Sequence, residues 1–209
     1  VFDKPVIVYT LKGFQRHPEI DAIEVVCLEG WSEVLWAYAR QFDKWVVPGG
    51  KTAQESIHSG VLALKDICGP DDLVVIHDGI RPMVEEFVLT DVLRKCRQYG
   101  NAVTSLPYNE QIFVADDSTT TTQYIPRDTL RRVSTPQAYR YEKLLWAYEK
   151  AFAEGIGIQA STYANTLMVD LGERLYFAAG SEKNIKLTTK DDFELFKCYM
   201  KIEKDHWLK

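Results

Sequence analysis

Short apolar runs alternate along this chain with longer segments whose apolar residues recur every three or four positions. Four runs are apolar on both faces, as buried strands are: residues 23–28, 44–47, 73–76 and 102–106. The segments around them have the periodicity of amphipathic helices: residues 5–17, 31–42, 52–64 and 85–99. This order predicts an α/β fold in which helices flank a doubly wound, mostly parallel sheet.

The alternation stops at residues 108–134, which predict a protruding β-hairpin arm. Residues 112–115 and 120–125 have the composition of two strands around a polar turn at residues 116–119. A two-stranded hairpin has little core of its own. We therefore expect the arm to pack on something else, and a second subunit is one candidate.

Beyond the arm, the pattern predicts a helix over residues 141–154 and strand-like stretches at residues 167–169 and 175–178. A last helix is expected after Thr189, whose hydroxyl is a suitable N-cap. Four residues are expected on the inner face of that helix: Leu195, Cys198, Tyr199 and Ile202.

The composition fits one domain covering residues 1–209, since 46% of the residues are hydrophobic and 26% are charged. The formal net charge of -5 argues against a broad nucleic-acid-binding surface. No apolar run approaches the roughly 20 residues of a transmembrane helix, and the first residues lack the pattern of a signal peptide. We predict a cytoplasmic protein with neither membrane nor nucleic-acid partners.

The cysteines are scattered along the chain and form no CxxC pair: Cys27, Cys68, Cys96 and Cys198. This spacing favours reduced thiols over disulfide bonds or a zinc site. Cys27 and Cys198 lie in apolar patterns, so both are expected in the core.

A strand predicted to be buried ends abruptly in the polar sequence His77-Asp78-Gly79-Ile80-Arg81-Pro82. In open α/β sheets, ligands bind at the carboxyl ends of the strands. A carboxylate at Asp78 suits Mg²⁺ that is bound to phosphates, and the planar fork of Arg81 suits a phosphate group. The alternative is a structural Asp–Arg pair at the rim of the sheet.

A glycine turn, Gly49-Gly50, leads into a predicted helix that starts with the capping-box pattern Thr52-Ala53-Gln54-Glu55. Backbone N–H groups at such a helix start suit an anion or the edge of a nucleotide. Ordinary strand-to-helix geometry is the alternative, since the turn is neither a P-loop nor GxGxxG. A basic set is the third candidate, although such charges are usually solvated: Arg127, Arg131, Arg132 and Lys186.

Four motifs follow one another over nearly the whole chain: Gly49-Gly50 with Ser56, His77-Asp78-x-x-Arg81-Pro82, Thr135-Pro136-Gln137 and Asn184-Ile185-Lys186-Leu187-Thr188. Together with the arm, they resemble the cytidylyltransferases of sugar-alcohol phosphates. That family includes the 2-C-methyl-D-erythritol 4-phosphate enzyme of isoprenoid synthesis and the ribitol 5-phosphate enzyme of teichoic-acid synthesis. The resemblance implies a Rossmann-like nucleotidyltransferase that converts CTP and an alcohol phosphate into a CDP-alcohol and pyrophosphate.

The resemblance also implies a nucleotide site and a metal. Gly49, Gly50, Ser56 and Gly79 would contact the nucleotide. Asp78 would bind the cofactor, Mg²⁺, against the triphosphate and would count as a catalytic residue.

By the same resemblance, Lys186 would offset negative charge on the transferring phosphate. Arg81, Glu110, Gln111 and Arg127 would bind the acceptor. Arg127 would act catalytically as well, supplied by the arm of the partner subunit in a homodimer.

The chain departs from the usual family pattern at four positions. Ala53 stands where GGxxR has arginine, Glu110-Gln111 replaces Asp-Thr, and Tyr163 replaces the acid of Thr-Asp-x-x-Ser. The family's first strand and its glycine-rich loop with arginine and lysine would precede Val1. We expect both in the full protein, because a doubly wound sheet without its central strand exposes two edges.

The leading hypothesis from the sequence is a cytidylyltransferase acting on 2-C-methyl-D-erythritol 4-phosphate, with ribitol 5-phosphate as the alternative acceptor. A second hypothesis is a catalytically weak nucleotide-binding relative, motivated by Ala53 and Tyr163. A third is a different nucleotidyltransferase on the same scaffold, because a fold does not fix a function.

Overall fold

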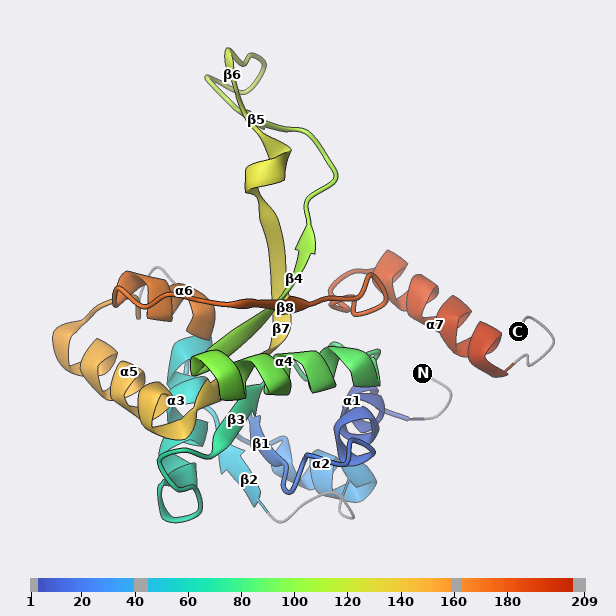
Figure 1. Cartoon of the computed structure of the whole chain (residues 1–209). Helices are drawn as coiled ribbons and strands as arrows, with labels where there is room; N and C mark the ends of the chain where they lie inside the picture. Colours follow the sequence, from blue (N-terminus) through green and yellow to red (C-terminus); the bar gives the residue numbers. More distant parts are fainter. Residues whose placement is uncertain (1–3, 40–44, 159–162, 205–209) are drawn as a thin grey trace.

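The computed structural model describes residues 4–39, 45–158 and 163–204 and confirms an α/β fold with a protruding arm (Figure 1). The central sheet has the strand order β3-β7-β4-β8. Its strands are β3 (Leu73–Ile76), β7 (Arg131–Arg140), β4 (Asn101–Pro107) and β8 (Phe177–Ala179). A separate parallel pair consists of β1 (Glu24–Cys27) and β2 (Trp45–Pro48).

The helices in the described ranges are α1 (Val6–Gln15), α2 (Ser32–Ala39), α3 (Ala53–Ala63), α4 (Glu86–Tyr99), α5 (Tyr141–Glu154), α6 (Ala164–Asp170) and α7 (Lys190–Lys204). None of these helices has the length and apolar character that crossing a bilayer requires. The structure does not describe residues 40–44. The end of the helix predicted over residues 31–42 and the start of the strand predicted over residues 44–47 therefore lie outside the described residues.

Strand β7 makes the central sheet mixed, because it runs antiparallel to both β3 and β4. The local sequence pattern does not predict this strand. Pro136 lies near its middle and cannot donate a ladder hydrogen bond, which argues against a strand on local grounds. The strand forms nevertheless, with a register shift opposite Val103 and Thr104, and its residues 135–139 are buried. Tertiary burial here overrides the local signal.

Alternate side chains of β3 face the two helical layers. Val74 and Ile76 pack in the cluster formed by α3, α5 and α6. Leu73 and Val75 pack against the cluster that α4 forms with β4 and β8. The strand is therefore apolar on both faces, as predicted for a sheet covered by helices on each side.

Helix α1 connects the two sheets. Leu11 packs in a cluster with Val25 of β1 and Val46 of β2. On the same helix, the ring of Phe14 lies 4.8 Å from that of His77, which follows β3. Apart from the hairpin of the arm, the described strands thus form two sheets joined through a helix, rather than the predicted single sheet.

The predicted strand at residues 167–169 is wrong, because these residues belong to helix α6. Leu167 and Met168 are both fully buried, and helical hydrogen bonds run from the Leu167 amide to the Tyr163 carbonyl oxygen (3.2 Å) and from the Leu171 amide to the Leu167 carbonyl oxygen (3.0 Å). An apolar run of three residues does not distinguish a strand from a helix.

The predicted inner face of the last helix is also wrong. The Thr189 cap is confirmed, since its Oγ1 accepts a hydrogen bond from the Asp192 amide (3.2 Å). However, Leu195 and Ile202 are 44% and 51% exposed, while Phe196 is fully buried. The four cysteines are free thiols as predicted, but Cys198 on this helix is exposed. Helix α7 is thus buried through a different face from the one expected.

The arm contains the predicted hairpin, with β5 (Ile112–Val114) antiparallel to β6 (Gln123–Ile125). It extends away from the central sheet (Figure 1). Asp117 stabilises the turn, because its Oδ1 accepts hydrogen bonds from the amides of Thr119 (2.7 Å) and Thr120 (2.8 Å). The hairpin leaves large apolar side chains in solvent: Phe113 and Tyr124 are 59% and 64% exposed.

The outer edge of β8 is closed by side chains of α4. The Ala179 amide donates to Asp91 Oδ2 (2.8 Å), and Lys95 Nζ donates to the Phe177 carbonyl oxygen (2.6 Å). Backbone groups at a sheet edge otherwise offer a template for pairing with another strand. Helix α4 therefore takes up one amide and one carbonyl group that a further strand would need.

Glu24 on β1 is a half-buried carboxyl group beneath α3. A Cβ at Gly60 of α3 would lie 2.9 Å from Glu24 Oε1 and 2.8 Å from Val26 Cγ2, so only glycine allows this close approach. Glu24 Oε2 has no hydrogen-bond partner within the described ranges. Burial raises the pKa of this carboxyl group to about 7.

We expect Glu24→Gln to stabilise the fold at pH 8 and to change its stability little at pH 5. Between its unfolded pKa of 4.5 and its folded pKa of about 7, the folded state retains the proton that the unfolded chain releases. Wild-type stability therefore falls as the pH rises through this window and stays reduced above it. The gain at pH 8 should be about 1 kcal/mol, discounted because the side chain is only partly buried.

Urea unfolding of both proteins at the two pH values measures this difference. The same stability change at pH 5 and at pH 8 would contradict the assignment to Glu24.

Candidate active site

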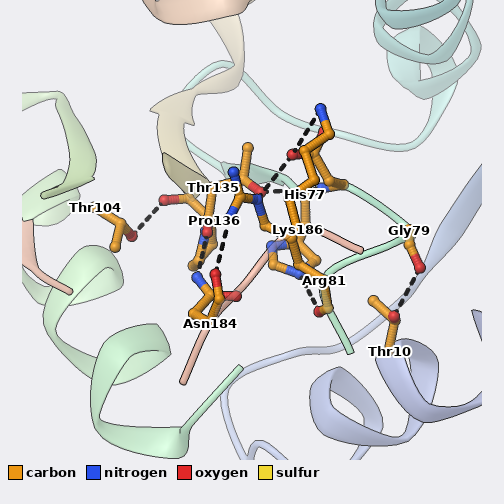
Figure 2. Close-up of polar contacts among 10 residues, drawn as sticks. Thr10, His77, Gly79, Arg81, Thr104, Thr135, Pro136, Asn184 and Lys186 are labelled. Carbon is orange, nitrogen blue, oxygen red and sulfur yellow. Dashed lines mark hydrogen bonds and ion pairs between the residues drawn. The ribbon is translucent and has the colours of Figure 1, made fainter. Parts of the chain in front are cut away.

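The loop after β3 is fixed by hydrogen bonds from three parts of the chain, and Figure 2 shows the one from α1, between Thr10 and Gly79. The Arg81 amide donates to the Asp78 carbonyl oxygen (3.0 Å), which closes a turn within the loop. From α1, Thr10 Oγ1 donates to the Gly79 carbonyl oxygen (2.8 Å). From the segment before α7, the Leu187 amide donates to the Ile80 carbonyl oxygen (2.9 Å). The loop is thus held in one conformation.

Asp78, Arg81 and Lys186 come together at this loop, as the sequence analysis predicted. Arg81 Nε lies 2.9 Å from Asp78 Oδ2, and Lys186 Nζ lies 3.6 Å from the same oxygen. The Arg81, Asp78 and Lys186 side chains are 15%, 24% and 31% exposed, so solvent or a ligand reaches all three. Two cations facing one carboxylate leave a net positive site that suits an anion such as a phosphate. The ion pair between Asp78 and Arg81 also fits the alternative interpretation, in which these two residues form a structural pair at the rim of the sheet.

Thr135 and Asn184 support this cluster with hydrogen bonds. Thr135 Oγ1 accepts from the Asp78 amide (3.1 Å), and the Thr135 carbonyl oxygen accepts from Asn184 Nδ2 (2.6 Å). The Asn184 carbonyl oxygen accepts from Arg81 Nη1 (2.8 Å). Figure 2 shows these residues converging from β7 and from the segment before α7. Both residues lie in motifs that the sequence analysis quoted, but it gave them no role. Their roles depend on β7, which local patterns did not reveal.

His77 positions the loop and brings no charge to it. The ring is largely buried, and this burial lowers its pKa to about 4, so the imidazole is neutral at pH 7. Nε2 lies 3.0 Å from the Arg81 carbonyl oxygen and donates to it in the corresponding tautomer. Nδ1 has no hydrogen-bond partner in the described part of the chain. A general acid–base role at neutral pH is not supported by this environment.

The glycine turn before α3 uses its backbone donors internally. The Gly50 amide donates to Ser56 Oγ (3.1 Å), while the amides of Lys51 and Thr52 donate to Glu55 Oε2 (2.5 and 3.2 Å). The predicted capping box is confirmed. Because the Glu55 carboxylate already occupies this helix start, the prediction of an open anion site there is wrong. The edge of a nucleotide remains the candidate ligand.

Both glycines of the turn are required by close approach. A Cβ at Gly50 would lie 2.2 Å from Glu55 Cβ, and a Cβ at Gly49 would lie 2.9 Å from Ser56 Oγ. The turn is therefore a compact, internally bonded structure that only two glycines fit.

A comparison of the sequence with protein families shows which family the chain belongs to. The family model described as 2-C-methyl-D-erythritol 4-phosphate cytidylyltransferase (IspD) matches residues 1–202. The chain belongs to this family. It is an enzyme, a CTP-dependent nucleotidyltransferase that acts on a sugar-alcohol phosphate.

Individual relatives carry two acceptor names. The chain is 59% identical over 205 residues to the ribitol-5-phosphate cytidylyltransferase of Lacticaseibacillus paracasei, covering 96% of this chain and 88% of the relative. It is 33% identical over 199 residues to the 2-C-methyl-D-erythritol 4-phosphate cytidylyltransferase of Clostridium novyi, covering 91% and 82%. The structure of the 4-diphosphocytidyl-2C-methyl-D-erythritol synthase of Anaerococcus prevotii shares the fold, with a TM-score of 0.82 at 24% identity over 95% and 86% of the two chains.

Three predicted site residues of this cytidylyltransferase lie apart from the cluster, on the arm. Glu110, Gln111 and Arg127 are exposed. Arg127 starts the short 3₁₀ helix Arg127–Thr129 and donates from Nη1 to the Asn109 carbonyl oxygen (3.1 Å). Among the residues that the structure describes, no hydrogen bond or ion pair joins it to the Asp78 cluster. One chain alone therefore does not assemble all the predicted groups.

Arg131 and Arg132, the other two arginines of the basic set, are exposed to solvent. This agrees with the expectation that such charges are usually solvated. Arg132 forms an ion pair with Glu182. Arg131 donates from Nη1 to the carbonyl oxygens of Leu130 (2.8 Å) and Asp128 (3.3 Å). Neither arginine belongs to the candidate active site.

Proposed function

We propose that this cytidylyltransferase transfers CMP from CTP to ribitol 5-phosphate, giving CDP-ribitol and pyrophosphate. The choice of ribitol 5-phosphate as the acceptor rests on the 59% identity to a ribitol-5-phosphate cytidylyltransferase. Relatives named for 2-C-methyl-D-erythritol 4-phosphate are 31–33% identical. That acceptor, which the sequence analysis placed first, is therefore the second candidate. A cytoplasmic location is part of the proposal.

The chemistry proposed for the cluster is phosphoryl transfer by positioning and charge stabilisation. An oxygen of the acceptor phosphate attacks the α-phosphorus of CTP, and the bond to the β-phosphate oxygen breaks as pyrophosphate leaves. Lys186 would offset the charge that builds on the transferring phosphate, and Arg81 would hold the acceptor phosphate. Their convergence at 3.6 and 2.9 Å from Asp78 supports both roles.

The donor set at Asp78 fits Mg²⁺. Its Oδ1 forms no hydrogen bond with any described residue, so one carboxylate oxygen remains available. No group of three or more His, Cys, Asp or Glu side chains gathers into a metal cage in the part of the chain described. Mg²⁺ suits such a site, because it takes one or two protein carboxylates together with substrate phosphates and water. When bound, it would neutralise part of the charge of the triphosphate.

The nucleotide base is proposed to bind at the Gly49-Gly50 turn, near Ser56. The amide of Gly50 is already bonded to Ser56 Oγ, so the backbone carbonyl oxygens of the turn are the groups suited to a ligand. Carbonyl oxygens accept from the exocyclic amino group of cytosine, which uracil lacks. Gly79, whose carbonyl oxygen is held by Thr10, would border the triphosphate.

The enzyme is further proposed to be a homodimer in which each arm reaches the site of the partner. The exposed Phe113 and Tyr124 give the arm an apolar surface without a core of its own. In this arrangement, Arg127, Glu110 and Gln111 would complete the acceptor site of the other protomer.

Turnover assays test the acceptor. Full-length protein should release pyrophosphate fastest with CTP, Mg²⁺ and ribitol 5-phosphate, with kcat/KM at least about tenfold above that for 2-C-methyl-D-erythritol 4-phosphate. The reverse order would restore the second candidate. Binding of CTP without turnover would indicate the catalytically weak relative, and turnover with no preference for CTP would indicate another nucleotidyltransferase.

Replacing Asp78 tests the metal role. Asp78→Asn should lower Mg²⁺-dependent turnover by about 100-fold or more and should weaken Mn²⁺ binding measured by electron paramagnetic resonance. Asp71→Asn, which changes an exposed aspartate shortly before β3, should leave both unchanged. Unaltered Mn²⁺ binding in Asp78→Asn would refute the metal role.

Mixing two inactive variants tests the arm. If Arg127 acts on the partner's site, a heterodimer of Asp78→Asn and Arg127→Ala contains one intact site and one doubly defective site. Subunit exchange between the two variants should then recover about a quarter of wild-type activity, since half of the dimers are mixed. No recovery despite exchange, or an active monomer by light scattering, would contradict the shared site.

A further inference from the structure

The ring of Tyr163 lies beside Lys186 in the candidate active site. Lys186 Nζ is 5.6 Å from the centroid of this ring and 3.6 Å from Asp78 Oδ2. The first distance is within the range of a cation–π interaction. The second is longer than a direct charge-assisted hydrogen bond of about 2.7–2.9 Å. The ammonium group thus lies between a ring and a carboxylate without closing onto the carboxylate.

The backbone of Tyr163 is anchored to the helix that follows the glycine turn. Gln54 on α3 is 1% exposed, and its Nε2 donates to the Tyr163 carbonyl oxygen (3.3 Å). Gln54 Oε1 in turn accepts from Tyr148 Oη of α5 (2.8 Å). The amide of Leu167 also donates to the Tyr163 carbonyl oxygen (3.2 Å), at the start of α6. The backbone of Tyr163 is therefore fixed relative to the proposed nucleotide site, and its ring, which is 44% exposed, extends from this anchored position toward Lys186.

We propose that Tyr163 is a positioning residue that holds the Lys186 ammonium away from Asp78 and ready for a phosphate; this inference rests on the proposed function. The negative face of an aromatic ring attracts a cation but leaves its charge and its N–H donors available. A carboxylate at this position, as in the usual family motif, would instead take up donors and neutralise the charge. Without the ring, Lys186 would move closer to Asp78, and the ion pair of 3.6 Å would shorten to a direct hydrogen bond.

Steady-state kinetics on three variants test this proposal. Tyr163→Leu should lower kcat about fivefold while the KM for CTP changes less than about twofold, because the lost interaction is the one that orients Lys186. Tyr163→Phe retains the ring and should stay within about twofold of wild type. Trp146→Leu is the matched control: it removes a ring that lies 5.4 Å from Lys143 Nζ on the exposed side of α5, and it should have no effect.

A spectroscopic measurement separates the contact from the catalytic function. Lysines methylated reductively with ¹³C-formaldehyde give methyl signals, and Lys186→Arg identifies the one from Lys186. In wild type and in Tyr163→Phe, that signal should be displaced by the ring current, and in Tyr163→Leu it should return to the position of solvated lysines. A signal that does not move, or equal losses of kcat in Tyr163→Phe and Tyr163→Leu, would overturn the proposal. Absence of turnover in the wild-type enzyme would refute the proposed function. The methyl signal of Lys186 would still report whether Lys186 contacts the Tyr163 ring.

Discussion

The candidate active site depends on a single carboxylate oxygen, Asp78 Oδ2, toward which two cations converge. Arg81 makes the shorter contact, at 2.9 Å, and Lys186 the longer, at 3.6 Å. The three groups come from two parts of the chain more than a hundred residues apart. Opposite charges at this separation attract strongly where solvent is partly excluded. The remaining polar contacts of the site keep these groups in place.

The scaffold around this oxygen is made of neutral groups. Thr135, Asn184 and the uncharged His77 hold the loop and the strand ends through hydrogen bonds, and burial keeps the imidazole from taking up a proton near pH 7. Buried neutral groups with hydrogen-bond partners avoid the large cost of desolvating further charges. The net charge of the site is therefore set by Asp78 and its two cations, which suits a ligand carrying several negative charges.

The fold class, most elements and the Asp78–Arg81 loop followed from local patterns in the sequence, whereas Lys186 was placed at this site only by the family resemblance. The strand β3 and the loop after it are adjacent in the chain, and strand ends gather at one edge of a sheet. What failed depended on distant contacts. Strand β7 contains Pro136 and is stabilised by burial between helical layers, and Leu167 lies in a run too short to reveal its period. The inner face of α7 was misjudged because Phe196, not the stripe around Leu195, meets the rest of the protein.

The closed edge of β8 affects how copies of this protein can associate. Lys95 and Asp91 occupy the outward carbonyl and amide groups of the last strand, so sheets from neighbouring molecules cannot be joined there into a continuous ribbon. Growth by strand addition is blocked at this flank of the molecule, whatever its concentration. The protection is specific to this flank, because the opposite edge of the central sheet is formed by β3.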